Sequence, residues 1–217
     1  MMNIAENISS LIKEIPSSVQ LVAVSKTKSN DDVMEAYNAG QRVFGENKIQ
    51  DMNIKHEKLP KDIEWHMIGH VQSNKVKHMA PYVSLIHGVD SLKLLEEINK
   101  QANKYNRIIP CLLQIHIAEE DNKFGLSPEE SQKLIQISKD LGNVKIKGLM
   151  GMATFTKKET QIAKEFSGLK SLYDQFIYNN IPLETLSMGM SGDYPIAIQK
   201  GSNMIRVGSK IFGPRNY

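Results

Sequence analysis

The chain has 217 residues, with 27 Lys+Arg against 24 Asp+Glu, and 41% of its residues are hydrophobic. This composition excludes a disordered chain, and a net charge of +3 without a basic stripe excludes an evident nucleic-acid surface. The one cysteine, Cys111, excludes an intrachain disulfide and favours a reducing compartment. Because the N-terminus does not resemble a signal peptide and no apolar run is long enough to cross a bilayer, we expect a cytoplasmic protein without membrane contact.

Short apolar or β-branched runs alternate with amphipathic helical runs along the chain. An amphipathic run, long enough for one helix, precedes the first strand. Eight runs predict strands, at residues 21–26, 42–45, 65–69, 83–87, 109–117, 145–150, 184–188 and 204–207.

Three helices have recognisable starts. Ser29 stands before acidic residues and predicts a helix that stops at Gly40. Ser127 begins a capping box with proline at the first helical position, and we expect Gly142 to close that helix. Thr156 predicts a second capping box, which opens a long helix to about residue 180.

Strands that alternate with helices predict parallel pairing through right-handed crossovers. Eight units of about 27 residues each approach the lower limit of a closed (β/α)8 barrel, roughly 200 residues. The rival, an open doubly wound sheet, would need a glycine-rich turn after the first strand, and residues 24–28 contain no glycine. We therefore expect an α/β fold with one barrel domain over residues 1–217, and an extra N-terminal helix that covers the bottom of the barrel.

Polar residues at the carboxyl ends of the strands are the candidates for chemistry, because barrels of this kind work at that end. Lys26 ends the first strand and shares a face with Val22 and Val24. Burial would lower the pKa of its amine, and a neutral amine attacks an aldehyde to form a Schiff base. The alternative is an exposed lysine beside Lys28. Further candidates after the other strands are Glu46, Asn47, His70, Ser73, Met152 and Thr154.

The loops after the last two strands are rich in glycine and hydroxyl groups, which can present backbone N–H donors to an anion. They contain Ser191, Gly208 and Ser209, and these are the ordinal positions at which barrels commonly hold phosphate. The alternative is a pair of ordinary turns.

Arg206 lies on the eighth strand, which neighbours the first strand in a closed barrel. A pyridoxal phosphate (PLP) site needs a Schiff-base lysine, a phosphate cradle and a group that faces the pyridine nitrogen. Lys26, the two loops and Arg206 stand in compatible places for these roles. A permanently charged arginine would disfavour protonation of the pyridine nitrogen and weaken the ring as an electron sink.

A metal site is disfavoured. His66 and His70 are four residues apart, which is roughly 13 Å along a strand, too far to share one ion. Cys111 lies inside a strand, where core packing is the expected role.

Seven motifs in order resemble the pyridoxal phosphate homeostasis proteins, the one-domain relatives of alanine racemase. The resemblance spans residues 20 to 215. The motifs are LVAVSKT (21–27), FGEN (44–47), WHMIGHVQSNK (65–75), KFG (123–125), GLM (148–150), LSMGMSGD (186–193) and IRVGSKIFG (205–213).

The resemblance implies a single TIM-type barrel of the alanine racemase N-terminal domain kind, with pyridoxal 5'-phosphate, a form of vitamin B6, on Lys26. It implies that Arg206 faces the pyridine nitrogen. It places phosphate contacts at Ser191, Gly208 and Ser209. It places Asn47 and Ser73 at positions that line the pocket.

Two lysines extend this comparison. Lys123 falls on the family's Lys-x-Gly motif and is a candidate for a secondary, transient PLP site. Lys48 departs from the family, which usually has an aromatic residue there, so a stacking role at this position is in doubt.

Three functions remain open. A racemase needs two opposed proton-transfer groups, and two-domain racemases take one from a β-rich domain that we expect to be absent here, because the chain ends at Tyr217. We therefore expect a non-catalytic carrier that buffers PLP and delivers it to apo-forms of PLP-dependent enzymes, and that is a monomer. The alternatives are a PLP-dependent amino-acid racemase or lyase of low activity and a Schiff-base aldolase that acts on a sugar phosphate.

Overall fold

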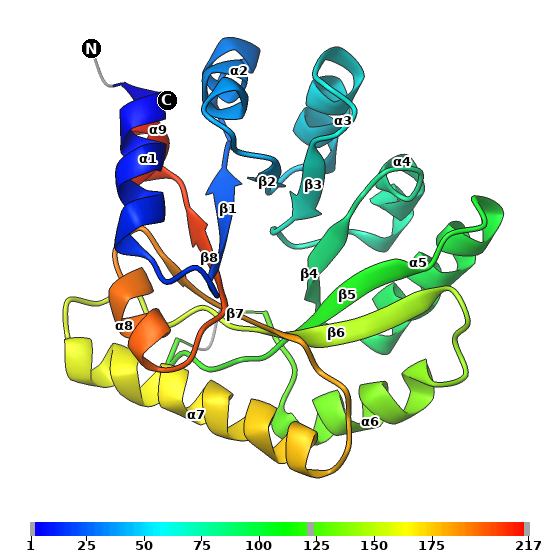
Figure 1. Ribbon diagram of the computed structural model, residues 1–217. Helices are drawn as coiled ribbons and strands as arrows, with labels where there is room; N and C mark the ends of the chain where they lie inside the picture. The colour runs from blue at the N-terminus through cyan, green and yellow to red at the C-terminus, as the bar shows by residue number, and fades with distance from the viewer. Residues whose placement is uncertain (1–2, 121–123, 215–217) are drawn as a thin grey trace.

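The computed structural model describes residues 3–120 and 124–214, and in these residues eight parallel strands close into a barrel (Figure 1). Each strand pairs with the next along the chain, and the last pairs with the first, so the predicted barrel is confirmed. The strands are β1 (Gln20–Val24), β2 (Val43–Glu46), β3 (Glu64–Met67), β4 (Leu85–Val89), β5 (Ile109–Gln114), β6 (Val144–Met150), β7 (Thr185–Met190) and β8 (Met204–Val207).

Side chains alternate between two cores along the strands, as a period of two residues requires. One face of each strand packs outward against the helices and includes Ala23 and Phe44. The other face fills the barrel with a smaller apolar cluster that includes Val22 and Met150. Parallel strands buried on both faces explain why the sequence shows apolar runs rather than strict alternation of apolar and polar residues.

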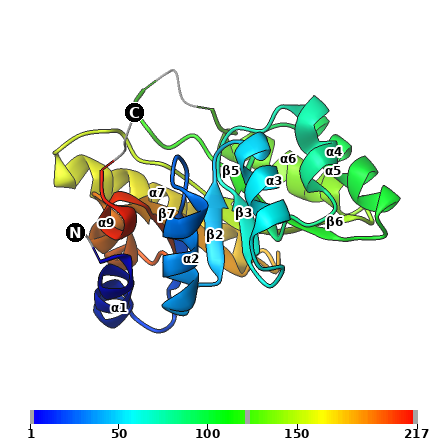
Figure 2. The same cartoon turned by 90° about the horizontal axis from the view of Figure 1, so that it is seen from above.

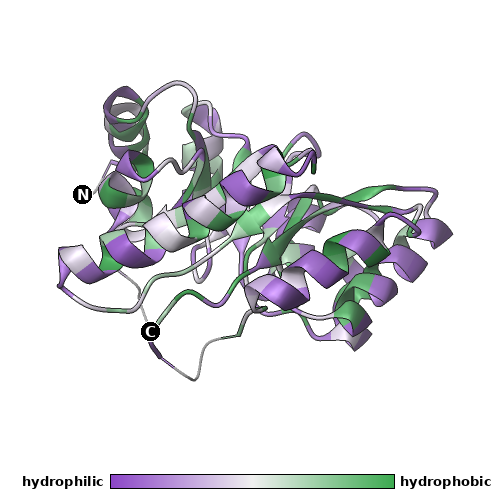
Figure 3. Ribbon diagram, turned by 90° about the horizontal axis from the view of Figure 1, so that it is seen from below, coloured by the Kyte–Doolittle hydropathy of each residue, from purple (hydrophilic) through white to green (hydrophobic). Residues whose placement is uncertain are grey.

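Helices surround the barrel as an outer layer (Figures 1 and 2). In Figure 3 α5 and α6 alternate green and purple along their length, as helices do when they bury one face. The helices are α1 (Ile4–Glu14), α2 (Asn30–Asn38), α3 (Ile49–Lys58), α4 (Val76–Met79), α5 (Leu92–Lys104), α6 (Pro128–Ser138), α7 (Glu159–Tyr178), α8 (Tyr194–Gln199) and α9 (Ser209–Phe212), with a short 3₁₀ helix, η1 (Ser73–Lys75). Among the described residues, none of these helices is long and apolar enough to span a bilayer.

The extra N-terminal helix is present, but its predicted place at the bottom of the barrel is wrong. Helix α1 stands in the outer layer beside α2 and α9 (Figures 1 and 2). The Ile4 N–H donates to Glu35 of α2, and the Asn7 amide donates to the carbonyl of Ile211 in α9. These two bonds, together with buried Ile8 and Leu11, hold α1 against its neighbours.

Helix starts that carry a true capping box are confirmed. The Ser29 and Ser127 hydroxyls each accept a hydrogen bond from the N–H three residues on, and the carboxylate of that third residue accepts one from the serine N–H. The predicted box at Thr156 is wrong, because its hydroxyl accepts from the Lys158 N–H in a local turn and α7 begins after Lys158. Helix α6 ends at Ser138, before the predicted stop at Gly142.

Strand boundaries also differ from the prediction: β1 ends at Val24, so Lys26 lies in the turn after the strand and not on it, and β4 and β5 have other bounds than predicted. Residues 83–84 belong to the turn after α4, where the Val83 N–H donates to the carbonyl of Met79, and β4 runs on to Val89. Strand β5 ends at Gln114: the Ile115 N–H still donates to the Met150 carbonyl of β6, but from Ile115 on the chain also pairs with Leu126 outside the named strands. Local apolar character cannot distinguish these loop pairings from a strand.

Gly148 in β6 lies so close to β7 that no side chain fits. A Cβ atom there would lie 1.7 Å from the carbonyl oxygen of Thr185. We expect Gly148→Ala to lower the free energy of unfolding by about 3 kcal/mol or more, because backbone must move to relieve the clash. Gly168→Ala is the control, since its Cβ meets nothing within 4 Å inside α7 and should add about 1 kcal/mol. Denaturant unfolding measures both, and equal stability of the two variants would contradict the expectation.

Candidate functional site

Lys26 lies in a strained turn directly after β1. The Lys28 N–H donates to the Ser25 carbonyl (3.1 Å), which closes a four-residue turn with Lys26 and Thr27 at its centre. Thr27 has a φ of +66°, a conformation that β-branched residues rarely adopt. Such strain costs about 1–3 kcal/mol and persists only where the surroundings hold it, often at functional sites. Lys26 itself is half-buried.

Lys28, the second lysine of this loop, has a structural role. Its amine donates to the carbonyls of Phe212 (2.8 Å) and Pro214 (2.9 Å), so it ties the loop after β1 to the end of α9. The two lysines therefore lie in different environments. Lys26 remains the candidate for chemistry at this strand end.

The loops after β7 and β8 meet each other and the end of β1. The Gly208 N–H donates to Ser191 Oγ (3.1 Å), and Ser209 follows as the first residue of α9. A Cβ atom on Gly208 would lie 3.2 Å from the Val24 carbonyl and crowd the end of β1. The contacts bring Ser191 and Gly208, with Ser209 next in the chain, into one cradle beside Val24, which stands two residues before Lys26. The structure thus brings Ser191 and Gly208 together, and their binding of an anion stays a prediction.

Arg206 lies inside the barrel beneath this cradle. It pairs in register with Val22 of β1, as expected from closure of the barrel. Its guanidinium donates from Nη1 to Ser187 Oγ (2.6 Å) and from Nη2 to the Gly151 carbonyl (3.0 Å). Burial lowers the pKa of Arg206 to about 10, with Asp193 acting in the opposite direction, so the group is charged at neutral pH.

Two buried histidines extend this contact across the barrel. His87 Nδ1 lies 3.2 Å from Ser187 Oγ, and His87 Nε2 lies 3.0 Å from His66 Nδ1. Since a guanidinium only donates, the Ser187 hydroxyl accepts from Arg206 and can donate to His87 Nδ1. His87 Nε2–H then donates to His66. The chain Arg206–Ser187–His87–His66 links β8, β7, β4 and β3.

Both histidines are neutral at physiological pH. Burial lowers the pKa of His66 to about 3. Burial, with His66 and Arg206 acting in the same direction, holds the pKa of His87 well below its usual range. In this hydrogen-bonded chain the charge of Arg206 is therefore supported by neutral groups.

Of the remaining predicted residues, Asn47 lies at a cavity, together with His70 and Lys48. It follows β2 and packs against Gly69, whose Cβ would lie 2.4 Å from the Asn47 carbonyl. Ser73 begins η1, outside the set of residues that line the cavity, and Lys123 lies outside the described residues. The cavity has a volume of about 190 Å³ and is lined by Asn47, Lys48, Ile49, Gln50, Met67, His70, Gln72 and Lys75.

The structure separates His66 from His70, as the spacing predicts. His66 is buried in the barrel, whereas His70 is exposed, pairs with Asp90 (3.1 Å) and stacks on Phe124. Within residues 3–120 and 124–214, no three His, Cys, Asp or Glu side chains gather as a metal site would require. Cys111 is buried, and burial raises the pKa of its thiol.

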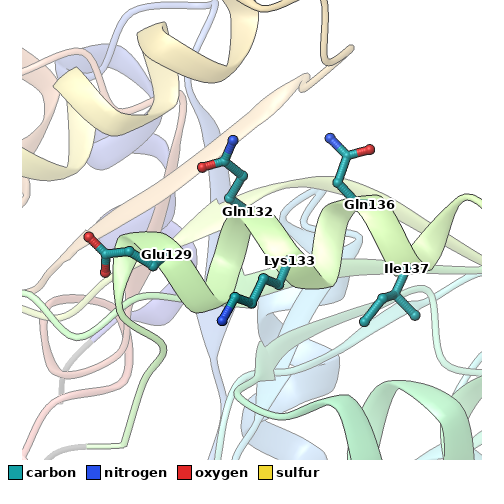
Figure 4. Close-up of a pocket in the computed structure, with 5 residues that line it drawn as sticks. All are labelled: Glu129, Gln132, Lys133, Gln136 and Ile137. Carbon is teal, nitrogen blue, oxygen red and sulfur yellow. The ribbon is translucent and has the colours of Figure 1, made fainter.

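A larger hollow of about 500 Å³ lies on α6, away from the strand ends. Its five lining residues all come from that one helix (Figure 4). They include Glu129, Lys133 and Ile137 and form an ordinary solvated helix face. Because ligand sites usually combine several elements, we place the site at the barrel mouth.

Sequence reasoning missed two groups of residues. Ser187, His66 and His87 were expected only as strand residues, although period-two alternation along β3 and β4 could have placed the histidines inside. Glu46 was expected at the mouth, but it faces outward and is buried against Lys55 of α3, 2.6 Å away. A single acidic residue within an apolar strand was the available signal for that pair.

The family model described as alanine racemase, N-terminal domain, matches residues 1–216. A protein of Aquifex aeolicus named pyridoxal phosphate homeostasis protein is 35% identical over 100% of both chains. A Helicobacter pylori protein of the same name is 42% identical and covers 89% of this chain and 87% of its own length.

Solved structures are also similar to this chain. PipY of Synechococcus elongatus, solved without PLP, matches with a TM-score of 0.92 and 36% identity over 97% of this chain and 100% of PipY. The structure of PipY with PLP bound matches with a TM-score of 0.90 and 35% identity over the same shares of the two chains. Alanine racemase of Clostridium difficile shares the fold, with a TM-score of 0.82 and 13% identity over 96% of this chain and 56% of that chain.

Proposed function

The chain belongs to the alanine racemase N-terminal domain family, among its pyridoxal phosphate homeostasis proteins, and from this premise we propose that it binds pyridoxal 5'-phosphate on Lys26 and serves intracellular PLP homeostasis. The attachment is a Schiff base, formed when the amine condenses with the cofactor aldehyde and water leaves. The barrel of residues 1–217 is the cofactor-binding domain, and the protein acts in the cytoplasm as a monomer.

The observation that carries the proposal is the meeting of three strand ends. The strained turn at Lys26, the cradle of Ser191 and Gly208, and the buried charge of Arg206 belong to neighbouring strands β1, β7 and β8. A phosphate needs N–H and hydroxyl donors, an aldehyde needs an amine, and a ring nitrogen accepts a hydrogen bond from a guanidinium. The residues present fit all three parts of the cofactor.

Each residue has a proposed task. Ser191, Gly208 and Ser209 bind the phosphate, and Arg206 faces the pyridine nitrogen. Asn47 and Ser73 line the pocket, and Lys123 is a secondary site that takes the cofactor transiently.

A carrier role is supported by the names of the relatives, which describe homeostasis. It is also supported by Arg206, because a fixed cation at the ring nitrogen opposes the protonation that makes the cofactor a strong electron sink. The partners that we propose are PLP itself and apo-forms of PLP-dependent enzymes. A PLP-dependent racemase or lyase of low activity is the alternative, because the fold is shared with alanine racemase.

Cofactor transfer tests the proposal directly. We expect the PLP-loaded protein to show a visible absorption band that borohydride removes, and to reactivate an apo-form of a PLP enzyme. A borohydride-treated sample is the control, since its cofactor cannot leave. In parallel, loaded protein is incubated with L- and D-amino acids while optical rotation and keto-acid formation are followed. Sustained turnover that disappears in Lys26→Ala would overturn the carrier role in favour of the enzyme.

A further inference from the structure

A buried cluster lies behind the turn that carries Lys26. Lys55 Nζ of α3 donates to the Ser25 carbonyl (2.7 Å) and to Glu46 Oε1 of β2 (2.6 Å). The Ser25 hydroxyl donates to the same Glu46 oxygen (2.7 Å). These three bonds join α3, β2 and the last residue before Lys26 into one unit.

Burial makes this cluster costly to keep. Glu46 is fully buried, Lys55 is 6% exposed, and Glu46 Oε2 has no hydrogen-bond partner among the described residues. Burial raises the pKa of Glu46, while Lys55 and Ser25 act to lower it. A buried ion pair contributes little net stability compared with an apolar pair of similar volume. A role other than stability would therefore explain why this cluster is buried beside the turn.

The cluster holds the anchor of the strained turn. The Ser25 carbonyl accepts from the Lys28 N–H, which closes the turn, and from Lys55 Nζ, which fixes that carbonyl to α3. Thr27, with its φ of +66°, would relax toward negative φ if the turn were released. Relaxation would change the backbone on which Lys26 is mounted.

We propose that Lys55, paired with Glu46, is a positioning residue that clamps the strained Ser25–Lys28 turn and so presents the Lys26 amine to the cofactor. The proposal rests on the proposed attachment of PLP to Lys26. Lys55 acts only through Ser25, on the outer side of the sheet. The Lys55 amine contacts the turn and β2. It therefore lies apart from the residues proposed to bind the cofactor.

The test uses Lys55→Met together with Glu46→Gln, so that no unpaired charge remains in the core and folding survives. We expect the double variant to form the borohydride-trapped bond at Lys26 about 10- to 100-fold more slowly, as displacement of a reacting group by about 1 Å does. In the protein without cofactor, the Lys28 amide should exchange its hydrogen faster, because its bond to Ser25 opens. The second readout needs no PLP, so it distinguishes failure of the clamp from failure of the proposed function.

Arg107→Met is the matched control. The Arg107 guanidinium is a half-buried cation that also ties backbone carbonyls, those of Ala80 (2.6 Å) and Val83 (2.7 Å), and it precedes β5 at the other end of the strands. The Arg107→Met variant should have a lower free energy of unfolding but should form the bond at Lys26 at the wild-type rate. Equal trapping rates and equal Lys28 exchange in the Lys55 double variant and in this control would overturn the proposal.

Thr27→Gly provides a rescue. Glycine adopts positive φ without strain, so the turn should keep its shape after the clamp is lost. Thr27→Gly added to the Lys55 and Glu46 changes should restore most of the trapping rate. A rate that stays low would overturn the part of the proposal in which release of strain at Thr27 misplaces Lys26.

Discussion

Lys26→Ala is expected to remove the stable covalent attachment of PLP while leaving the fold intact. The amine is the group that condenses with the aldehyde, and no substitute is available in an alanine side chain. The phosphate cradle of Ser191 and Gly208 is unchanged, so the variant should still bind PLP, but more weakly and without the borohydride-reducible band. Borohydride reduction followed by mass spectrometry of the peptides measures the effect.

Lys28→Met is the control for this prediction. Lys28 stands two residues away, and its amine is held by the carbonyls of Phe212 and Pro214. The variant should lose some stability at the end of α9 but keep the reducible cofactor on Lys26. Reducible cofactor in Lys26→Ala in the same amount as in the wild type, or its loss in Lys28→Met alone, would contradict the assignment.

Stability is expected to fall steeply in mild acid because two histidines are buried as neutral groups. Their pKa values are depressed in the native state, to about 3 for His66, so the unfolded chain binds more protons below its usual pKa of 6.5. The free energy of unfolding is therefore complete at neutral pH and decreases as the pH falls through 6.5. At pH 5 each histidine should have cost about 2 kcal/mol, a large share of the 5–15 kcal/mol typical of a domain.

Denaturant unfolding between about pH 5 and 7 isolates this effect, since carboxylates titrate mainly below that range. His56, whose pKa burial also lowers, adds to the same trend. His87→Gln should roughly halve the pH slope, because it removes one of the two histidines buried inside the barrel. A wild-type protein whose stability is flat across this range would contradict the burial of neutral histidines.

Much of the barrel was predictable because its signals are local. The strand periodicity, the helix cap at Ser29 and the capping box at Ser127 depend on residues within one element, and all three are confirmed. The false box at Thr156 and the overlong fifth strand show the limit of such signals. In both places loop hydrogen bonds, which depend on distant chain segments, decide where the element begins or ends.

Part of the candidate site could also be predicted from local signals. Lys26 and the cradle residues Ser191, Gly208 and Ser209 could be proposed from the sequence because each follows a strand whose ordinal place sets its position at the mouth. Arg206 could be proposed because closure makes β8 the neighbour of β1.

The sequence by itself thus determined the barrel, the order of its strands and the residues offered at its mouth, because these depend on short-range patterns. The tertiary structure alone decided the surroundings of those residues. Ser187 meets His87 across 100 residues of chain, and Lys55 reaches Ser25 across 30. Such contacts arise only when closed strands and packed helices bring distant segments together, and they determine which charges are buried and which turn is held under strain.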